Sequence, residues 1–131
     1  SFGSQILVSS IDAKRNQNGM ELFTHGGTRE TGVNLEDWIK TCNAAPVGEL
    51  LMNSIDRDGT GLGFDLEMTK IATSLSQVPV IASGGAGSVE HFSEVLDTGV
   101  NAVLAAGVFH RGEIGIGEAK KAMRQSGAEV R

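Results

Sequence analysis

The 131-residue sequence has a single cysteine and no uninterrupted apolar stretch that approaches the roughly 18 residues a membrane-spanning helix requires. One cysteine, Cys42, cannot form a disulfide within the chain, which is typical of proteins in a reducing compartment. No signal peptide is visible. These absences predict a cytoplasmic protein that does not contact a membrane.

The chain is also poor in aromatic residues and in clustered positive charge. Aromatic side chains make up 5% of the residues, and the net charge is −5 at pH 7. Nucleic-acid binding requires clustered Lys and Arg to neutralise phosphates, and because the sequence has no basic stripe, no nucleic-acid partner is expected. Trp38 and the phenylalanines at helical positions are predicted to lie in the core rather than to form a stacking platform.

The sequence carries no metal-binding or cofactor-binding motif. The histidines His25, His91 and His110 are not spaced as metal ligands, and one cysteine adds no zinc pattern. A nucleophile elbow, a P-loop and a dinucleotide-binding fingerprint are all missing. We therefore expect no metal and no cofactor, and we interpret His91 as a surface or packing residue of a helix.

Glycine, in contrast, is abundant. It accounts for 18 of the 131 residues, roughly twice its average share, and it is concentrated at the ends of apolar runs, where turns need it. Four such runs are nearly continuous in apolar or small residues, as in parallel strands that are covered on both faces. They predict β-strands at residues 5–11, 49–55, 79–82 and 101–106.

A segment with helical spacing of apolar residues follows each predicted strand. These helices are expected at residues 35–45, 65–76, 88–98 and 116–126. Asn34 is a suitable N-cap for the first of them. Four consecutive βα units predict a parallel sheet with right-handed crossovers, in one α/β domain over residues 1–131. The extra segment at residues 16–32 alternates in polarity, which indicates a small hairpin or excursion strand above the main sheet.

Two architectures fit this order of elements. A four-stranded open sheet would be flavodoxin-like, although small. A closed (β/α)8 barrel needs eight units and about 250 residues, so four βα units with parallel strands and outer helices would be half of it. In both, ligands bind beyond the carboxyl ends of the strands. The chain starts at Ser1 without a methionine, as a segment of a longer protein would.

Acidic residues follow the first two predicted strands. Asp12 could serve as a general acid or base, and the alternative is a structural Asx turn or helix cap. In Asp56-Arg57-Asp58, an ion pair with Arg57 could orient one carboxylate while the other faces the pocket. The alternative is a solvated turn, because Asp-Gly is a common turn dipeptide. We favour a functional role for Asp58 and interpret Asp56 as a structural residue or as a support behind the pocket.

Glycine-rich segments follow the third and fourth predicted strands. A Ser-Gly-Gly turn before a helix offers backbone N–H groups and the positive end of a helix dipole to an anion, and glycine lets a phosphate approach the main chain. The segment after the fourth strand could add a neighbouring N–H group, as in barrels that bind phosphate after strands seven and eight. Each segment alone fits a tight turn, but together they favour a phosphate site at Ser83, Gly84, Gly85, Ala106 and Gly107.

The sequence closely resembles the cyclase subunit of imidazole glycerol phosphate synthase. The resemblance covers essentially the whole chain and rests on six segments, in order: SIDAKR, THGGTRETG, ELLMNSIDRDGT, GFDLEM, PVIASGGAGSVEHF and AVLAAGVFHRGEI. The related phosphoribosyl isomerase of the same pathway shares the barrel and the glycine-rich phosphate grip, but these segments are those of the cyclase. The resemblance implies the C-terminal half of a (β/α)8 barrel.

The resemblance also implies an activity in histidine biosynthesis. The family takes ammonia from a glutaminase partner and adds it to a phosphoribulosyl-formimino-aminoimidazole carboxamide nucleotide. It then forms imidazole glycerol phosphate and the aminoimidazole carboxamide nucleotide. Asp12 matches one of two catalytic aspartates, and Asp58 matches a pocket residue that supports catalysis. Glu49 matches a member of the charged ring that gates the ammonia channel. One of two phosphate sites corresponds to Ser83, Gly84, Gly85, Ala106 and Gly107.

Two departures from the family bear on function. Gly107 stands where the family commonly has serine, which removes a hydroxyl donor but keeps the backbone N–H. The first half of the barrel, with the other catalytic aspartate and phosphate site, is missing. The chain is then either half of a cyclase, active when joined to an N-terminal half, or a stand-alone half-barrel that binds phosphate without turnover. Because a half-barrel exposes apolar strand edges, we expect it to pair with the N-terminal half or with a second copy as a homodimer.

Overall fold

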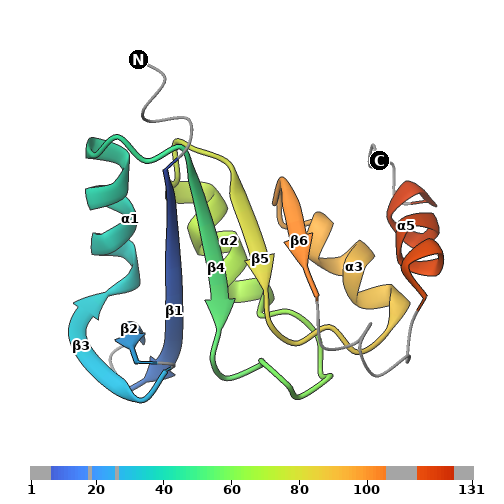
Figure 1. Cartoon of the computed structure of the whole chain (residues 1–131), viewed down its shortest axis with the longest axis horizontal. Helices are drawn as coiled ribbons and strands as arrows, with labels where there is room; N and C mark the ends of the chain where they lie inside the picture. The colour runs from blue at the N-terminus through green and yellow to red at the C-terminus, as the bar shows by residue number, and fades with distance from the viewer. Residues whose placement is uncertain (1–6, 18, 26, 106–114, 126–131) are drawn as a thin grey trace.

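The computed structural model describes residues 7–17, 19–25, 27–105 and 115–125. Four parallel strands form the main part of one sheet (Figure 1). They are β1 Val8–Asn16, β4 Glu49–Ser54, β5 Val80–Ser83 and β6 Ala102–Leu104. The helices that follow them in the chain are α1 Leu35–Ala44, α2 Leu66–Leu75, α3 Val89–Leu96 and α5 Ile116–Gln125. The predicted order of four βα units is confirmed.

Capping side chains begin the first two helices. The side chain of Asn34 accepts hydrogen bonds from the backbone N–H groups of Glu36 (2.9 Å) and Asp37 (3.3 Å), as the sequence predicted. Asp65 caps α2 in the same way, through the N–H of Met68 at 3.0 Å. Because each cap satisfies N–H groups that have no partner inside the helix, it fixes where the helix leaves the preceding loop.

Two further strands extend the sheet beyond β1. β2 Gly19–Thr24 and β3 Arg29–Asn34 form the predicted hairpin, and the sheet order is β3-β2-β1-β4-β5-β6. This hairpin was expected above the main sheet, and that expectation is wrong. The hairpin pairs antiparallel with the second half of β1, from Asp12 opposite Phe23 to Asn16 opposite Gly19. β1 therefore continues five residues past the predicted end, because the hairpin supplies hydrogen-bonding partners for residues 12–16.

The described helices cover one face of the sheet, and none of them lies on the other (Figure 1). Side chains alternate along a strand, and the helix-facing residues Leu50, Met52 and Ser54 of β4 are buried. Phe64 and Phe92 complete this core edge to face, with ring centroids 5.8 Å apart. Trp38 packs against the core and donates its indole N–H to the hydroxyl of Ser9 (3.3 Å). Trp38 of α1 and Phe92 of α3, the aromatic residues of the described helices, thus lie in or against the core, as predicted.

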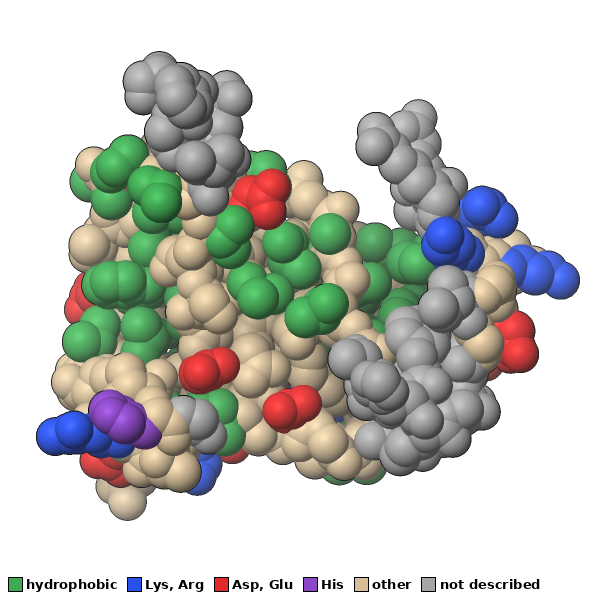
Figure 2. Space-filling view, in the orientation of Figure 1, with side chains coloured by type: hydrophobic (Ala, Val, Ile, Leu, Met, Phe, Trp, Pro, Cys, Tyr) green, Lys and Arg blue, Asp and Glu red, His purple; other side chains and the backbone are tan. Residues whose placement is uncertain are grey.

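The opposite face of the sheet, here called the open face, carries apolar side chains without a covering helix. The strand pairings place Val8, Leu51, Ile81 and Leu104 on it, and Val8 and Leu104 are about half exposed, at 52% and 50%. Figure 2 shows hydrophobic side chains gathered over the strands on this face. The sequence predicted coverage on both faces; in this structure the described helices cover only one.

Parallel strands with helices on one face form half of a (β/α)8 barrel, in which the open face would line the barrel interior. A flavodoxin-like sheet has helices on both faces, so this alternative does not fit the described residues. None of the described helices is both long and apolar enough to span a bilayer.

A candidate active site at the carboxyl edge of the sheet

Three polar residues lie side by side on the open face at the carboxyl ends of neighbouring strands. Asp12 of β1 is in register with Asn53 of β4, and Asn53 is in register with Ser83 of β5. Because all three occupy the same level of the sheet, their side chains form a polar row on the open face, nearer the carboxyl ends of the strands than Leu51 and Ile81. Such a row is placed where ligands bind in α/β folds.

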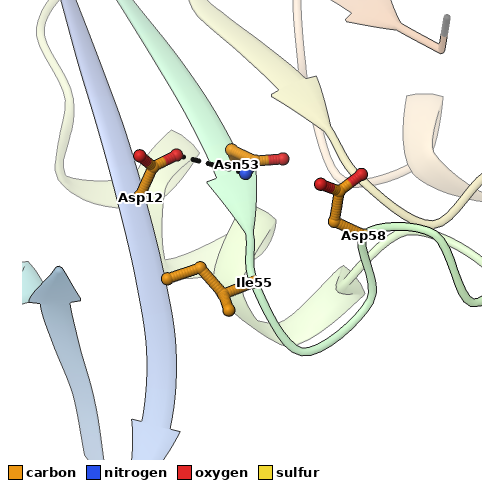
Figure 3. Close-up of a pocket in the computed structure, with 4 residues that line it drawn as sticks. All are labelled: Asp12, Asn53, Ile55 and Asp58. Carbon is orange, nitrogen blue, oxygen red and sulfur yellow. Dashed lines mark hydrogen bonds between the residues drawn. The ribbon is translucent and has the colours of Figure 1, made fainter. Parts of the chain in front are cut away.

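Asp12 and Asp58, both predicted as catalytic, line one shallow pocket of about 240 Å³ together with Asn53 and Ile55. Figure 3 shows the two carboxylates on either side of Asn53. The amide Nδ2 of Asn53 donates a hydrogen bond to Oδ1 of Asp12 (3.1 Å). One carboxylate is therefore held by a neutral donor from the next strand, and the other comes from the loop that follows that strand.

Asp58 is exposed and is held through its backbone. Its N–H donates to the carbonyl of Ser54 (2.9 Å), which closes a turn at the end of β4. The suggested ion pair of Arg57 with an adjacent carboxylate is wrong, since both ion pairs among the described residues are made by Arg15. Arg57 instead donates to the carbonyl of Leu62 (3.2 Å). Asp56 makes a structural contact, since its Oδ2 accepts a hydrogen bond from the backbone N–H of Arg15 (2.8 Å).

The guanidinium of Arg15 forms a two-pronged ion pair with Asp65, the N-cap of α2. Nη2 lies 2.8 Å from Oδ1, and Nη1 bonds Oδ2. Nη2 also donates to Glu67 (3.0 Å). The side chain of Asp65 is 2% exposed and that of Arg15 is 38% exposed. Burial by itself would raise the pKa of Asp65, but the hydrogen bonds from Arg15 and Met68 hold it below its ordinary value.

The predicted phosphate loop follows β5 and packs backbone to backbone against the loop that carries Asp58. The N–H of Gly63 donates to the carbonyl of Gly85 (2.7 Å). A Cβ on Gly85 would collide with the Gly63 carbonyl, and one on Gly87 would collide with the backbone of Gly61. Gly85 also has a φ of +110°, which disfavours other residues. Glycine here brings the two loops into direct contact.

His91 holds the end of the phosphate loop. Its Nδ1 accepts hydrogen bonds from the backbone N–H groups of Gly87 (3.0 Å) and Ser88 (3.2 Å). The ring also covers Gly63, where an added Cβ would lie 3.3 Å from its Cδ2. The predicted surface or packing residue is thus half-buried and ties the start of α3 to both loops.

The remaining predicted site residues are distributed as follows. Ser83 is half-buried at the end of β5, and the next two residues, Gly84 and Gly85, are buried. Glu49 lies at the opposite end of the sheet from Asp12, half-buried on the open face beside Val8. Ala106 and Gly107 lie outside the described residues. Among the described residues, no group of three or more His, Cys, Asp or Glu side chains could hold a metal ion.

Sequence reasoning missed Asn53, Arg15 and His91 as members of the site. Asn53 could have been found, because it is a polar residue one position before the carboxyl end of a largely apolar strand. No comparable signal marks Arg15, whose partner lies 50 residues further along the chain. The site thus offers two carboxylates for proton transfer and an adjacent glycine loop for an anion.

Comparisons with known proteins show to which family the chain belongs. A family model described as "Histidine biosynthesis protein" matches residues 1–115. The imidazole glycerol phosphate synthase subunit HisF of Thermobifida fusca is 48% identical over 99% of this chain and 53% of its own length. The HisF subunits of Metallosphaera sedula and Streptomyces coelicolor are 50% and 49% identical, again over 99% of this chain and 52% of their own lengths.

These relatives show how much of a HisF subunit the chain matches. It spans about half the length of the curated relatives it matches. The family match runs through β1, β4, β5 and β6 and so includes both aspartates of the pocket and the glycine loop. With 115 of its 131 residues matched, the chain belongs to the histidine biosynthesis protein family.

Proposed function

We propose that the chain is the C-terminal half of an imidazole glycerol phosphate synthase cyclase. The observation that carries this proposal is the pocket shared by Asp12 and Asp58, next to a glycine loop at the carboxyl edge of the sheet. In this function, ammonia reacts with a phosphoribulosyl-formimino-aminoimidazole carboxamide nucleotide. Ring closure and cleavage then give imidazole glycerol phosphate and the aminoimidazole carboxamide nucleotide.

Each residue of the site has a distinct part in the proposed reaction. Asp12 transfers protons to and from the reacting atoms, with Asn53 holding its carboxylate in place. Asp58 supports the reaction from the other side of the pocket. Backbone N–H groups of Gly84 and Gly85, with the hydroxyl of Ser83, bind one phosphate of the substrate; Ala106 and Gly107 complete that grip.

The second half of the proposed site lies on the part of the barrel that the relatives possess and this chain does not span. It would supply the other aspartate and the other phosphate grip. Ammonia would come from a glutaminase subunit and enter at the opposite end of the barrel, past Glu49. The position of Glu49 at the amino end of β4, on the open face, supports this path.

The open face favours a second candidate function, a self-associating half-barrel that binds phosphate without turnover. Its apolar residues would then be covered by a second copy of the chain. Both candidates use the same glycine loop, but only the first needs the other catalytic aspartate. Turnover therefore separates the two functions.

The deciding experiment measures ammonia-dependent product formation. The chain is assayed alone and after fusion to the part of the Thermobifida fusca subunit that it does not cover. The cyclase proposal expects product from the fusion. Lack of product from a folded fusion that still binds inorganic phosphate would refute the cyclase proposal and support the binding module.

A further inference from the structure

Arg15 holds both ends of the loop that carries Asp58. Its backbone N–H donates to the carboxylate of Asp56 (2.8 Å), at the beginning of the loop. Its guanidinium forms the two-pronged pair with Asp65, at the end of the loop. Hydrogen bonds to Arg15 of β1 therefore anchor both ends of the loop at residues 56–65.

The end at Asp65 is rigidly placed. The Asp65 side chain is 2% exposed, and besides the ion pair it accepts the N–H of Met68 as the N-cap of α2. A guanidinium presents parallel N–H groups that match both oxygens of a carboxylate, which fixes orientation as well as distance. The loop therefore meets α2 in an orientation set by β1.

The same strand carries the other acid of the pocket. Asp12 lies three residues before Arg15 on β1, and both residues belong to one continuous strand. Contacts within the loop, such as Arg57 with the carbonyl of Leu62 (3.2 Å), shape its middle but do not connect it to β1. The glycine contacts connect the loop to the segment after β5. Among these contacts, those of Arg15 tie the Asp58 loop directly to the strand of Asp12.

We propose that Arg15 is a positioning residue that fixes Asp58 relative to Asp12. Its catalytic consequence rests on the proposed cyclase function, whereas its effect on the loop does not. A structural ion pair alone would contribute to stability and leave the loop between its partners unaffected. A positioning residue should change the order of the Asp58 loop and the turnover rate even where the protein stays folded.

The loop is tested first, by amide hydrogen exchange in the protein with Arg15 replaced. Arg15→Met keeps the length and the apolar stem of the side chain but removes the guanidinium, and Arg15→Lys keeps the positive charge. We expect exchange of the Asp58 and Thr60 amides to accelerate by about 10-fold or more in Arg15→Met and less in Arg15→Lys, with the β4 amides unchanged. Lys70→Gln, which removes an exposed positive charge on α2, is the matched control and should change neither. Unchanged exchange of the loop in a folded Arg15→Met variant would overturn the proposal.

The catalytic consequence is tested in the full barrel, with this chain fused to the part of the relative that it does not cover. We expect kcat to fall on the order of 10-fold or more in Arg15→Met, because small displacements of a catalytic group are costly. KM should change less, since the glycine contacts still hold the phosphate loop. Arg15→Lys should recover part of kcat. Equal losses in Arg15→Met and Arg15→Lys that follow their thermal stability would overturn positioning in favour of a structural role.

The two proposals fail in different ways. If the unsubstituted fusion shows no ammonia-dependent turnover, the cyclase function is refuted, and the exchange experiment still decides whether Arg15 orders the loop. If the fusion is active and the exchange of the Asp58 loop changes without any change in kcat, positioning for catalysis is refuted while the cyclase function stands.

Discussion

At the scale of single residues, the site depends on how Asp12 is held. The amide of Asn53 is a neutral donor, and it leaves the second carboxylate oxygen of Asp12 available to a substrate. A carboxylate fixed by the next strand has little freedom to turn away from the pocket. The pair is therefore suited to repeated proton transfer at one position.

Replacing the carboxylate of Asp12 tests this role. In the fused barrel, Asp12→Asn should lower kcat by about 10²- to 10⁴-fold, the usual contribution of a general acid or base, with little change in KM. The measurement is ammonia-dependent turnover at saturating substrate. Asp97→Asn, an exposed aspartate at the end of α3, is the matched control. Activity of Asp12→Asn close to that of the control would show that Asp12 transfers no proton.

The contact between the two glycine loops is a second feature of single residues. Gly87→Ala should lower the free energy of unfolding by about 1–3 kcal/mol, because the added methyl group meets the backbone of Gly61. It should also weaken binding of inorganic phosphate. The control is Gly117→Ala in α5, where a Cβ meets nothing within 4 Å. Urea denaturation and phosphate titration measure both effects; an unaffected Gly87→Ala variant would show that the loops can separate freely.

At the scale of elements, α2 is anchored to β1 by an ion pair whose strength depends on pH. The pKa of Asp65 lies below its ordinary value in the folded state, against about 3.9 in an unfolded chain. Ionised Asp65 thus favours folding. This contribution is fully present above about pH 4 and is lost as the pH falls through the folded-state pKa.

Asp65→Asn should remove this pH-dependent contribution while keeping an oxygen that can cap α2. At pH 7 we expect the free energy of unfolding to fall by about 2–3 kcal/mol, less than for a fully buried pair because Arg15 is partly exposed. The difference between the two proteins should shrink as the pH is lowered below about 4. Denaturation at several pH values provides the measurement. A difference that stays constant down to pH 2 would contradict the assigned role of ionised Asp65.

The elements themselves were largely predictable, and the contacts between them were not. Apolar runs and caps such as Asn34 are local signals, so the strands and helices of all four units follow from the sequence. The hairpin was predicted, but its pairing with β1 depends on hydrogen-bonding groups that only the assembled sheet brings together. The position of the pocket was predictable, because the carboxyl ends of parallel strands lie at one edge of the sheet. The ion pair of Arg15 was not, because its partner lies 50 residues away in the sequence and no local pattern marks it.

At the scale of the whole molecule, the open face is the surface on which we expect a partner to bind. Its apolar residues alternate along the strands with the residues that are buried against the helices. The geometry of the strands therefore places them on this face. In a complete barrel this face would be the interior. In the isolated chain the apolar side chains of this face would be exposed to water, and exposed apolar patches promote association with another chain.

We therefore expect the isolated chain to form a homodimer at micromolar concentration, seen by sedimentation. Leu104→Lys places a charge on the open face and should shift the chain toward monomer. Leu62→Lys is the matched control, because Leu62 is 71% exposed in the loop after β4 and not on a strand of the open face. A stable monomer of the unsubstituted chain, or a dimer insensitive to Leu104→Lys, would contradict the prediction.

The same face cannot bind a second copy and an N-terminal half at once. A symmetric dimer that closes an eight-stranded barrel would bring two copies of Asp12 to one mouth, in place of the two different aspartates of the cyclase. An added N-terminal half should therefore displace one copy and convert the homodimer into a one-to-one complex, with loss of the homodimer peak in sedimentation. Persistence of the homodimer with the N-terminal half bound to it would show that the two contacts use different surfaces, and that the open face is not the interior of the barrel.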